Sequence, residues 1–580
     1  MAVFVAVVAV DGRAPDPELQ RRLADGVAFL GAPQTAASPD GVLTVAFAGR
    51  GTGFASADEV SVAASGRLDD RARLEAALDL GPGFATPDML LAAYRRWGAA
   101  MLEHIIGDFA FVLWDAREKR LLAATDQFGT RPIHYGSATP WLILSTAIGP
   151  IRDSGLVDTG LDETFIADFI AVGVPLDVAV TVHRGIRRLP PAHRFGWTGG
   201  APRIERYWRI PEPTAPLRLS TRADYVETFR SAFFAAVADR LPAEGPISLA
   251  LSGGMDSPSI AAAVCAILGA EATAARVQAH TIVYRDFPEE EGRFAQLVVE
   301  RLGISATTWT AEDFLLGATH VKWRVGPQPD ALRELAPESA IVEGAAASGA
   351  TRFSGLGGDV LLWPSPVTPW GAVSSGAWTP PALVHHLRLF GELPSAGMRP
   401  LARRWLRPPP PRPIPPWLRP DLVTRTGLDA RLAVLTADRR QGPRAFESPH
   451  WARLAAAGDP GNSGLDVQIT RPFMDVRLIE FVTRLPAPLL RQKRVLREAM
   501  RPWLPAEIVA RPKTPLGQAS AYIRAQPQVV ARGLQLIDLA PELERYVDVP
   551  ALRAAATRWT ARDSGAVRRC EALAMWMRNR

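Results

Sequence analysis

A glycine-rich segment near the middle of the 580-residue chain, Ser252-Gly253-Gly254-Met255-Asp256-Ser257, separates two apolar runs of different period. The run before it, residues 247–251, has the length of a buried strand and includes Leu249. After it, apolar residues recur at helical spacing as far as Leu268. A strand, a tight glycine turn and a helix N-terminus together predict an anion site, because the backbone comes close and its free N–H groups and helix dipole favour negative charge.

The side chains of this segment narrow the prediction to a phosphate bound with a metal. Ser252 and Ser257 add hydroxyl donors, and Asp256 supplies a hard oxygen ligand suited to Mg²⁺. The Walker loop is excluded because the chain contains no Gly-Lys-Ser or Gly-Lys-Thr. An ordinary glycine turn before a helix is the alternative, and the two serines and the aspartate favour the nucleotide interpretation.

A second glycine turn, Ser354-Gly355-Leu356-Gly357-Gly358-Asp359, follows a short predicted strand at residues 351–354. Further strands are predicted at 280–284 and 306–310, and helices separate them. This alternation predicts a doubly wound parallel sheet with ligands outside the strand C-termini. The first turn also resembles the pyrophosphate-binding loop of the ATP pyrophosphatases, which implies ATP as a cofactor. Asp256 and Asp359 are then the predicted ligands of Mg²⁺, a second cofactor that would bind the triphosphate.

Composition indicates a globular protein of more than one domain, with 47% hydrophobic and 22% charged residues. The net charge of +6 favours an arginine-rich solvated surface over a nucleic-acid partner, since no concentrated basic stretch occurs. The chain has two cysteines, far apart, which excludes a disulfide framework and fits a cytoplasmic protein. No apolar run reaches transmembrane length, so we expect no membrane partner.

Residues 1–208 contain short alternating strands and several phrases that resemble the glutamine-amidotransferase domain of asparagine synthetases. These phrases are residues 66–70, 94–98, 107–115 and 126–135. The resemblance implies an N-terminal Ntn-type αββα sandwich. Working glutaminases of that family carry a cysteine directly after the initiator Met, and this chain has Ala2 there. We therefore expect a degenerate domain that supports the second domain or shapes its substrate entrance.

Residues 217–580 resemble the ATP-pyrophosphatase domain of asparagine synthetases, with a helical C-terminus. The matching phrases, after the two glycine turns, are residues 471–475, residues 493–499, Leu504-Pro505 and Arg511-Pro512-Lys513. The resemblance implies that Lys513 is a catalytic cation, together with Asp256 and Asp359 as catalytic residues. It also implies a nucleotide site formed by Leu249, Ser252, Gly253, Gly254, Asp256, Ser257, Ser354, Gly355, Leu356 and Lys493.

A proline- and tryptophan-rich insertion, residues 364–420, interrupts this second domain. Proline runs forbid helix and favour polyproline II or an irregular cover. We interpret the insertion either as a mobile linker or as a lid that recognises substrate, with Trp363, Trp370 and Trp417 as candidate contacts.

The chemistry implied by the resemblance is adenylation of a carboxylate by ATP, followed by amide formation and release of AMP and pyrophosphate. Ala2 argues against a glutamine-fed asparagine synthetase. Leu356 stands where asparagine synthetases carry glutamate and β-lactam synthetases carry tyrosine. The chain most resembles lasso peptide cyclases, also called macrolactam synthetases, which lack a working glutaminase and carry insertions after the second glycine turn.

That family implies a leader-cleaved core peptide as substrate, and a leader peptidase and a leader-recognition protein as partners. The alternatives are a β-lactam synthetase-like or ammonia-dependent asparagine synthetase-like ligase acting on a small acid, and a nucleotide-binding scaffold without chemistry. A tRNA-modifying pyrophosphatase shares the first glycine turn. The amidotransferase-like first domain and the absence of Cys-x-x-Cys argue against it.

Overall fold

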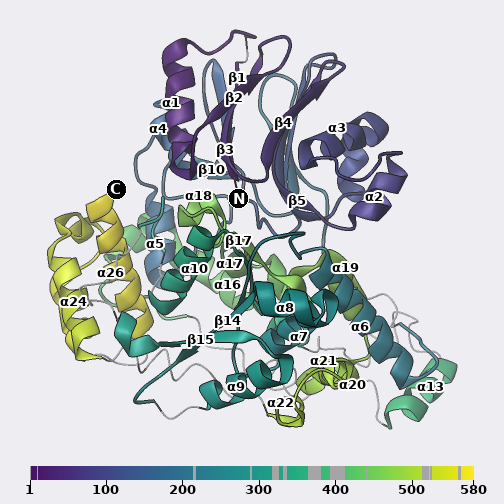
Figure 1. Cartoon of the computed structure of the whole chain (residues 1–580). Helices are drawn as coiled ribbons and strands as arrows, with labels where there is room; N and C mark the ends of the chain where they lie inside the picture. Colours follow the sequence, from purple (N-terminus) through teal and green to yellow (C-terminus); the bar gives the residue numbers. More distant parts are fainter. Residues whose placement is uncertain are drawn as a thin grey trace.

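The described part of the chain contains an antiparallel sandwich, a parallel sheet covered by helices, and a group of helices from the C-terminal region (Figure 1). This computed structural model describes residues 2–9, 11–212, 217–287, 290–315, 325–330, 336–363, 380–391, 412–438, 440–512, 522, 526–558 and 563–580. Lys513, Trp370 and most of the predicted 364–420 insertion lie outside these residues. The predicted domain boundaries at 208 and 217 stay predictions.

The sandwich consists of two antiparallel sheets packed face to face, each with six strands among the described residues. The order in the first sheet is β10 (Arg187–Arg188), β8 (His134–Ala138), β9 (Trp141–Ser145), β1 (Ala2–Ala9), β3 (Leu43–Gly49), β2 (Gln34–Ala37). The order in the second is β12 (Arg203–Arg206), β11 (His193–Trp197), β7 (Arg120–Thr125), β6 (Gly107–Asp115), β5 (Val60–Leu68), β4 (Thr52–Ala57).

Both faces of strand β1 are buried, which explains why its sequence is continuously apolar. Phe4 and Val8 point into the core between the two sheets. Val3 and Val7 point to the other face, under helices α1 (Pro17–Val27) and α4 (Ile148–Asp153). The outer face of the second sheet is covered by α2 (Arg71–Ala77) and α3 (Thr86–Trp97). The order helix–sheet–sheet–helix confirms the predicted αββα sandwich (Figure 1).

The third sheet, outside the sandwich, is parallel throughout its described strands, as predicted. Its strand order is β15 (Ser305–Thr310), β14 (Val277–Val283), β13 (Ile247–Ala250), β16 (Thr351–Phe353), β17 (Gln468–Thr470). The chain moves outward from β13 to β15 and then crosses back to β16 on the other side of β13. That reversal is the topological switch point, where open parallel sheets bind their ligands.

Helices lie on both sides of the parallel sheet. Right-handed crossovers put the helices of the outward and returning parts of the chain on opposite faces, and α9 (Glu291–Leu302) and α10 (Ala336–Ser348) lie on opposite sides in Figure 1. The core beneath also receives α6 (Arg222–Ala238), α7 (Asp256–Leu268), α19 (Val476–Thr483) and α21 (Arg494–Met500). Strand β17 and the short helix α8 (Ala270–Arg276) are additions that the sequence patterns did not predict.

The C-terminal helices enclose a helix that comes from the N-terminal half of the chain. Phe165 and Phe169 of α5 (Glu163–Val172) are buried in one cluster with side chains of α15 (Pro420–Thr426), α16 (Leu428–Ala437), α24 (Pro527–Asp538), α25 (Val549–Arg558) and α26 (Ser564–Asn579). Trp417 belongs to this cluster and is 1% exposed. The expectation that it contacts substrate is therefore wrong, because its ring is buried against the protein. Trp363, by contrast, is 53% exposed.

Within the described ranges, no helix has both the length and the apolar character needed to cross a bilayer.

Candidate functional site

The two glycine turns leave the same edge of the parallel sheet from adjacent strands. β13 and β16 are parallel neighbours, with Leu249 paired to Phe353. The first turn continues into α7, and the second into the short helix α11 (Gly358–Leu361). The turns therefore lie side by side at the switch point, and the predicted nucleotide residues of both come together there.

The first turn is shaped by its own serines. Ser252 N donates to Ser257 Oγ at 2.8 Å, and the two hydroxyl oxygens lie 3.0 Å apart. Gly254 N donates to Ser252 Oγ at 3.3 Å. Both hydroxyls are thus held at the mouth of the turn, beside the N-terminus of α7, where an anion is favoured.

The glycines of the second turn are required because the two turns touch. A β-carbon at Gly355 would lie 3.1 Å from Ser257 N, and one at Gly358 would lie 2.5 Å from Asp256 Cγ. Gly357 has φ +101°, which a residue with a side chain rarely adopts. A side chain at Gly355 or Gly358 would push the two turns apart, so these two glycines allow Asp256 and Asp359 to lie close together.

A single lysine joins the two predicted metal ligands. Lys493 Nζ lies 2.6 Å from Asp256 Oδ1 and 2.6 Å from Asp359 Oδ1. Lys493 and Gln492 both have left-handed backbone angles, with φ +57° and +51°. Two successive strained residues of this kind are typical of functional sites. Lys493 directly precedes α21, and its left-handed backbone accompanies a side chain whose ammonium lies between the two carboxylates.

This arrangement fits a nucleotide bound with a divalent cation. The two carboxylates both contact the Lys493 ammonium, and the glycine turns and a helix N-terminus lie beside them. Among the described residues, no group of three or more His, Cys, Asp and Glu side chains gathers to hold a metal by itself. Mg²⁺ commonly takes one or two carboxylates and completes its shell with phosphate oxygens and water, so Asp256 and Asp359 would suffice.

The remaining predicted residues have different positions around this centre. The Leu249 side chain is buried in the sheet core, so a ligand could contact Leu249 only through its backbone. Ser354 is tied to β17 through Thr470, whose carbonyl accepts from Ser354 N at 3.0 Å. Leu356 N donates to Ser354 Oγ at 3.3 Å, which places Leu356 within the second turn. Lys513 lies outside the described residues.

Glu291, which the sequence patterns did not single out, contacts the first turn and pairs with Arg511 of the matching phrase at residues 511–513. Gly253 N donates to Glu291 Oε2 at 2.6 Å, and Glu291 Oε1 forms an ion pair with Arg511 Nη1 at 3.1 Å. Glu291 is the first residue of α9 and belongs to a run of three glutamates, which as a sequence signal looks like a solvated helix start.

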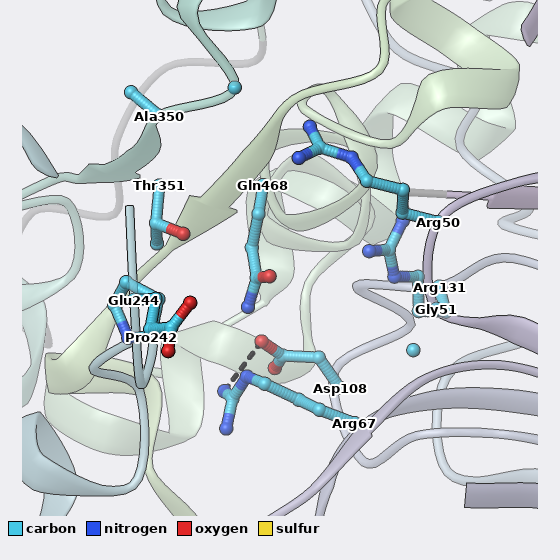
Figure 2. A pocket seen from close by; sticks show the side chains of 12 residues that line it. Arg50, Gly51, Arg67, Asp108, Arg131, Pro242, Glu244, Ala350, Thr351 and Gln468 are labelled. Atoms are coloured by element: carbon cyan, nitrogen blue, oxygen red, sulfur yellow. Dashed lines mark hydrogen bonds and ion pairs between the residues drawn. The ribbon is translucent and has the colours of Figure 1, made fainter. Parts of the chain in front are cut away.

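A charged pocket of about 220 Å³ lies between the sandwich and the parallel sheet (Figure 2). Thr351 and Gln468, the first residues of β16 and β17, line it, so it lies at the sheet edge opposite the glycine turns. The other lining residues are Arg50, Gly51, Gly66, Arg67, Asp108, Arg131, Pro242, Glu244, Gly349 and Ala350. This pocket is therefore separate from the predicted nucleotide site.

Residues 66–70 take part in a buried ion-pair network between the two halves of the chain. Arg67 donates to Asp108 at 2.7 Å and also pairs with Asp69. Arg240 then bridges Asp69, at 3.1 Å, and Asp475, at 2.8 Å. Burial would raise the pKa of Asp475, but its arginine neighbours lower it below the usual value. This network holds the sandwich against the synthetase-like half.

Neither cysteine is placed to act in the sandwich. Cys265 lies in α7 and Cys570 in α26, and burial raises the pKa of these thiols to about 11 and about 12. Strand β1 begins at Ala2, which is paired across the sheet with Gly49. The position that would carry a nucleophilic thiolate therefore carries alanine.

Comparison with known families decides the classification. The asparagine synthase family matches residues 228–578, and a glutamine amidotransferase domain matches residues 64–208. The chain belongs to the asparagine synthase family. Members of this family use ATP, and the family match spans both glycine turns and the Lys493 region.

Several known proteins are similar to parts of the chain. Asparagine synthetase [glutamine-hydrolyzing] 3 of Bacillus subtilis is 28% identical over 175 residues, 30% of this chain and 28% of that protein. A putative asparagine synthetase of Mycobacterium tuberculosis is 25% identical over 478 residues, 75% of this chain and 70% of that protein. The first three curated relatives are matched over only 26–28% of their lengths. Among solved structures, glutamine phosphoribosylpyrophosphate amidotransferase from B. subtilis aligns with a TM-score of 0.26 and 12% identity. The alignment covers 56% of this chain and 67% of that one.

Proposed function

We propose that this protein is an ATP-dependent amide ligase that forms AMP, and that its substrate is a leader-free core peptide. The observation that carries the ligase proposal is the pair of glycine turns at the switch point, with Lys493 between Asp256 and Asp359. These groups gather hydroxyls, backbone N–H groups and charge where a triphosphate would bind. Bound Mg²⁺ would neutralise charge on the pyrophosphate as it leaves.

The proposed reaction has two steps. A side-chain carboxylate oxygen of an Asp or Glu in the peptide attacks the α-phosphorus of ATP, and the bond to pyrophosphate breaks. The peptide's own N-terminal amine then attacks the acyl carbon, AMP leaves, and the nitrogen loses a proton to form a macrolactam. Lys493 and Lys513 would stabilise the negative charge that develops in these steps.

The peptide substrate is supported by what the chain lacks. Ala2 leaves no thiol to release ammonia from glutamine, so an amine from another source must be used. Leu356 in the second turn has no group that accepts a proton. A peptide held with its amine near its own carboxylate needs less help from a base, since orientation in favourable intramolecular reactions is worth about 7–11 kcal/mol. Trp363, two residues after the end of α11, is 53% exposed.

An ammonia-dependent asparagine synthetase-like or β-lactam synthetase-like ligase on a small acid is the second candidate. It is supported as strongly by the family, because the named relatives are asparagine synthetases.

The peptide proposal also includes two expected partners, a leader peptidase and a leader-recognition protein, and a location in the cytoplasm.

The test is intact-mass analysis of a leader-free peptide from the neighbouring locus, incubated with protein, ATP and Mg²⁺, with Asp256→Ala as the control. Loss of one water from the peptide, with AMP formed by the active protein alone, is the expected result. AMP formation only with small carboxylic acids, with or without ammonium, would establish the second candidate. No AMP with any substrate would leave a nucleotide-binding scaffold.

A further inference from the structure

The two carboxylate oxygens of Glu291 contact different parts of the candidate site. Oε2 accepts a hydrogen bond of 2.6 Å from the backbone N–H of Gly253, in the first glycine turn. Oε1 lies 3.1 Å from Arg511 Nη1. The Glu291 and Arg511 side chains are 12% and 9% exposed, so both contacts are largely shielded from water.

Arg511 is held in this position by packing as well as by charge. Its guanidinium lies over the ring of Phe294, 4.0 Å from the ring centroid. A β-carbon at Gly253 would lie 2.3 Å from Arg511 Nη1 and 2.7 Å from Phe294 Cβ. The first turn and Arg511 are therefore in direct contact, and glycine at position 253 makes this contact possible.

Arg497 connects Arg511 to the lysine between the two aspartates. Its Nη2 donates to the Arg511 carbonyl at 2.7 Å, and its Nε donates to the Gln492 carbonyl at 2.7 Å. Gln492 directly precedes Lys493, which pairs with Asp256 at the end of the same turn. The contacts thus form a closed circuit from the first turn through Glu291, Arg511, Arg497 and Lys493 back to Asp256.

We propose that Glu291 is a positioning residue that fixes the triphosphate turn relative to the chain segment ending at Arg511, an inference that rests on the proposed ligase function. Oε2 fixes the position of the first glycine turn, which would bind the triphosphate. Oε1 fixes the position of Arg511, and therefore also that of the Arg511 carbonyl, which accepts a hydrogen bond from Arg497. Lys513 follows Arg511 by two residues in the sequence. One carboxylate therefore aligns the triphosphate turn with Arg511 and, through Arg497, with Lys493, the cation between the two aspartates.

The two oxygens allow the two tasks to be separated by mutation. Glu291→Gln keeps an acceptor for Gly253 N but removes the charge opposite Arg511, so the KM for MgATP should stay within about twofold while kcat falls about tenfold or more. Glu291→Ala removes both contacts, so the KM should also rise about tenfold. Arg511→Met should reproduce Glu291→Gln, and the double variant should be no slower than either single variant.

Pyrophosphate release, thermal unfolding and a matched control complete the test. Glu290→Gln changes the preceding, exposed glutamate, which pairs with Arg293, and should behave as wild type. A merely structural role for Glu291 would lower the melting temperature and the active fraction without separating kcat from KM. Equal changes in both constants for Glu291→Gln, or additive losses with Arg511→Met, would overturn the proposal.

Failure of the proposed function gives a different result. In that case wild type releases no pyrophosphate with any peptide or small acid. Binding of a non-hydrolysable ATP analogue with Mg²⁺ then tests the positioning directly. Glu291→Ala should bind it about tenfold more weakly, and Glu291→Gln should bind it as wild type does. Equal binding by all three proteins would overturn the positioning role.

Discussion

Arg131 Nη1 lies 2.7 Å from Asp459 Oδ2, in an ion pair whose two side chains are 2% and 0% exposed. The pair joins the antiparallel sandwich to the synthetase-like half. Arg131 comes from the phrase at residues 126–135, and Asp459 caps the short helix α18 (Pro460–Ser463). A phrase that resembles an amidotransferase motif thus serves here as a contact between the two halves.

Arg131→Met should destabilise the protein strongly, because it leaves Asp459 buried without its partner. Removing one member of a buried ion pair costs about 3–5 kcal/mol. Arg50→Met is the matched control, since Arg50 pairs with Asp466 across the same boundary but is 64% exposed, and its loss should cost about 0–1 kcal/mol. Thermal unfolding measures both, and equal melting temperatures would contradict the prediction.

Lys493→Met should make the stability of the ligand-free protein depend on Mg²⁺. Without the ammonium, Asp256 and Asp359 repel each other, and a divalent cation relieves that repulsion. The melting temperature of the variant should rise by several degrees between EDTA and millimolar Mg²⁺, and that of wild type should change less. Lys493→Arg retains the positive charge and should resemble wild type. If the melting temperature of Lys493→Met does not change with Mg²⁺, this would argue against a metal at these carboxylates.

Leu356→Glu should slow macrolactam formation. A third carboxylate at the second turn would repel both the triphosphate and the substrate carboxylate, and a tenfold loss corresponds to about 1.4 kcal/mol. The measurement is the initial rate of peptide cyclisation, with Leu356→Met as a control of similar volume. Unchanged or faster cyclisation would count against a peptide-contacting role for Leu356.

His280 should make the protein less stable in acid. Burial, with a smaller effect from Arg352, lowers the pKa of His280 from 6.5 to about 4, and Trp309 Nε1 donates to its Nδ1 at 3.2 Å. The unfolded chain takes up this proton near pH 6.5, so the stabilisation is present above that pH and is lost as the pH falls toward 4. The melting temperature should drop between pH 7 and 5, and His280→Gln should reduce the drop by about 2 °C. An identical drop in both proteins would show that His280 does not contribute.

The local parts of the site were predictable from the sequence. The strand before Ser252, the glycine turn and the helix to Leu268 follow from short-range periodicity and from the need for close backbone approach. The second turn was predictable for the same reason. That Asp256 and Asp359 face each other followed from the predicted parallel sheet, because adjacent strands end at the same edge.

Contacts between distant segments were not predictable in this way. Strand β17 has three residues, too few to show a period, and it exists because β16 offers it an edge. Arg131 and Asp459 are 328 positions apart, and neither carries a local signal. Trp417 lies in a proline-rich stretch that indicated an exposed cover, but tertiary packing buries it. The Glu291–Arg511 pair was missed because a glutamate at a helix start is usually solvated.

Helix α5 has a consequence for how the protein is made. Its residues Phe165 and Phe169 are buried by helices that include α26, which begins at Ser564. The ribosome must therefore add almost 400 further residues before that apolar face can be covered completely. At 5–20 residues per second this takes about 20–80 s. During synthesis the N-terminal half exposes an aromatic surface whose cover is completed only by the end of the chain.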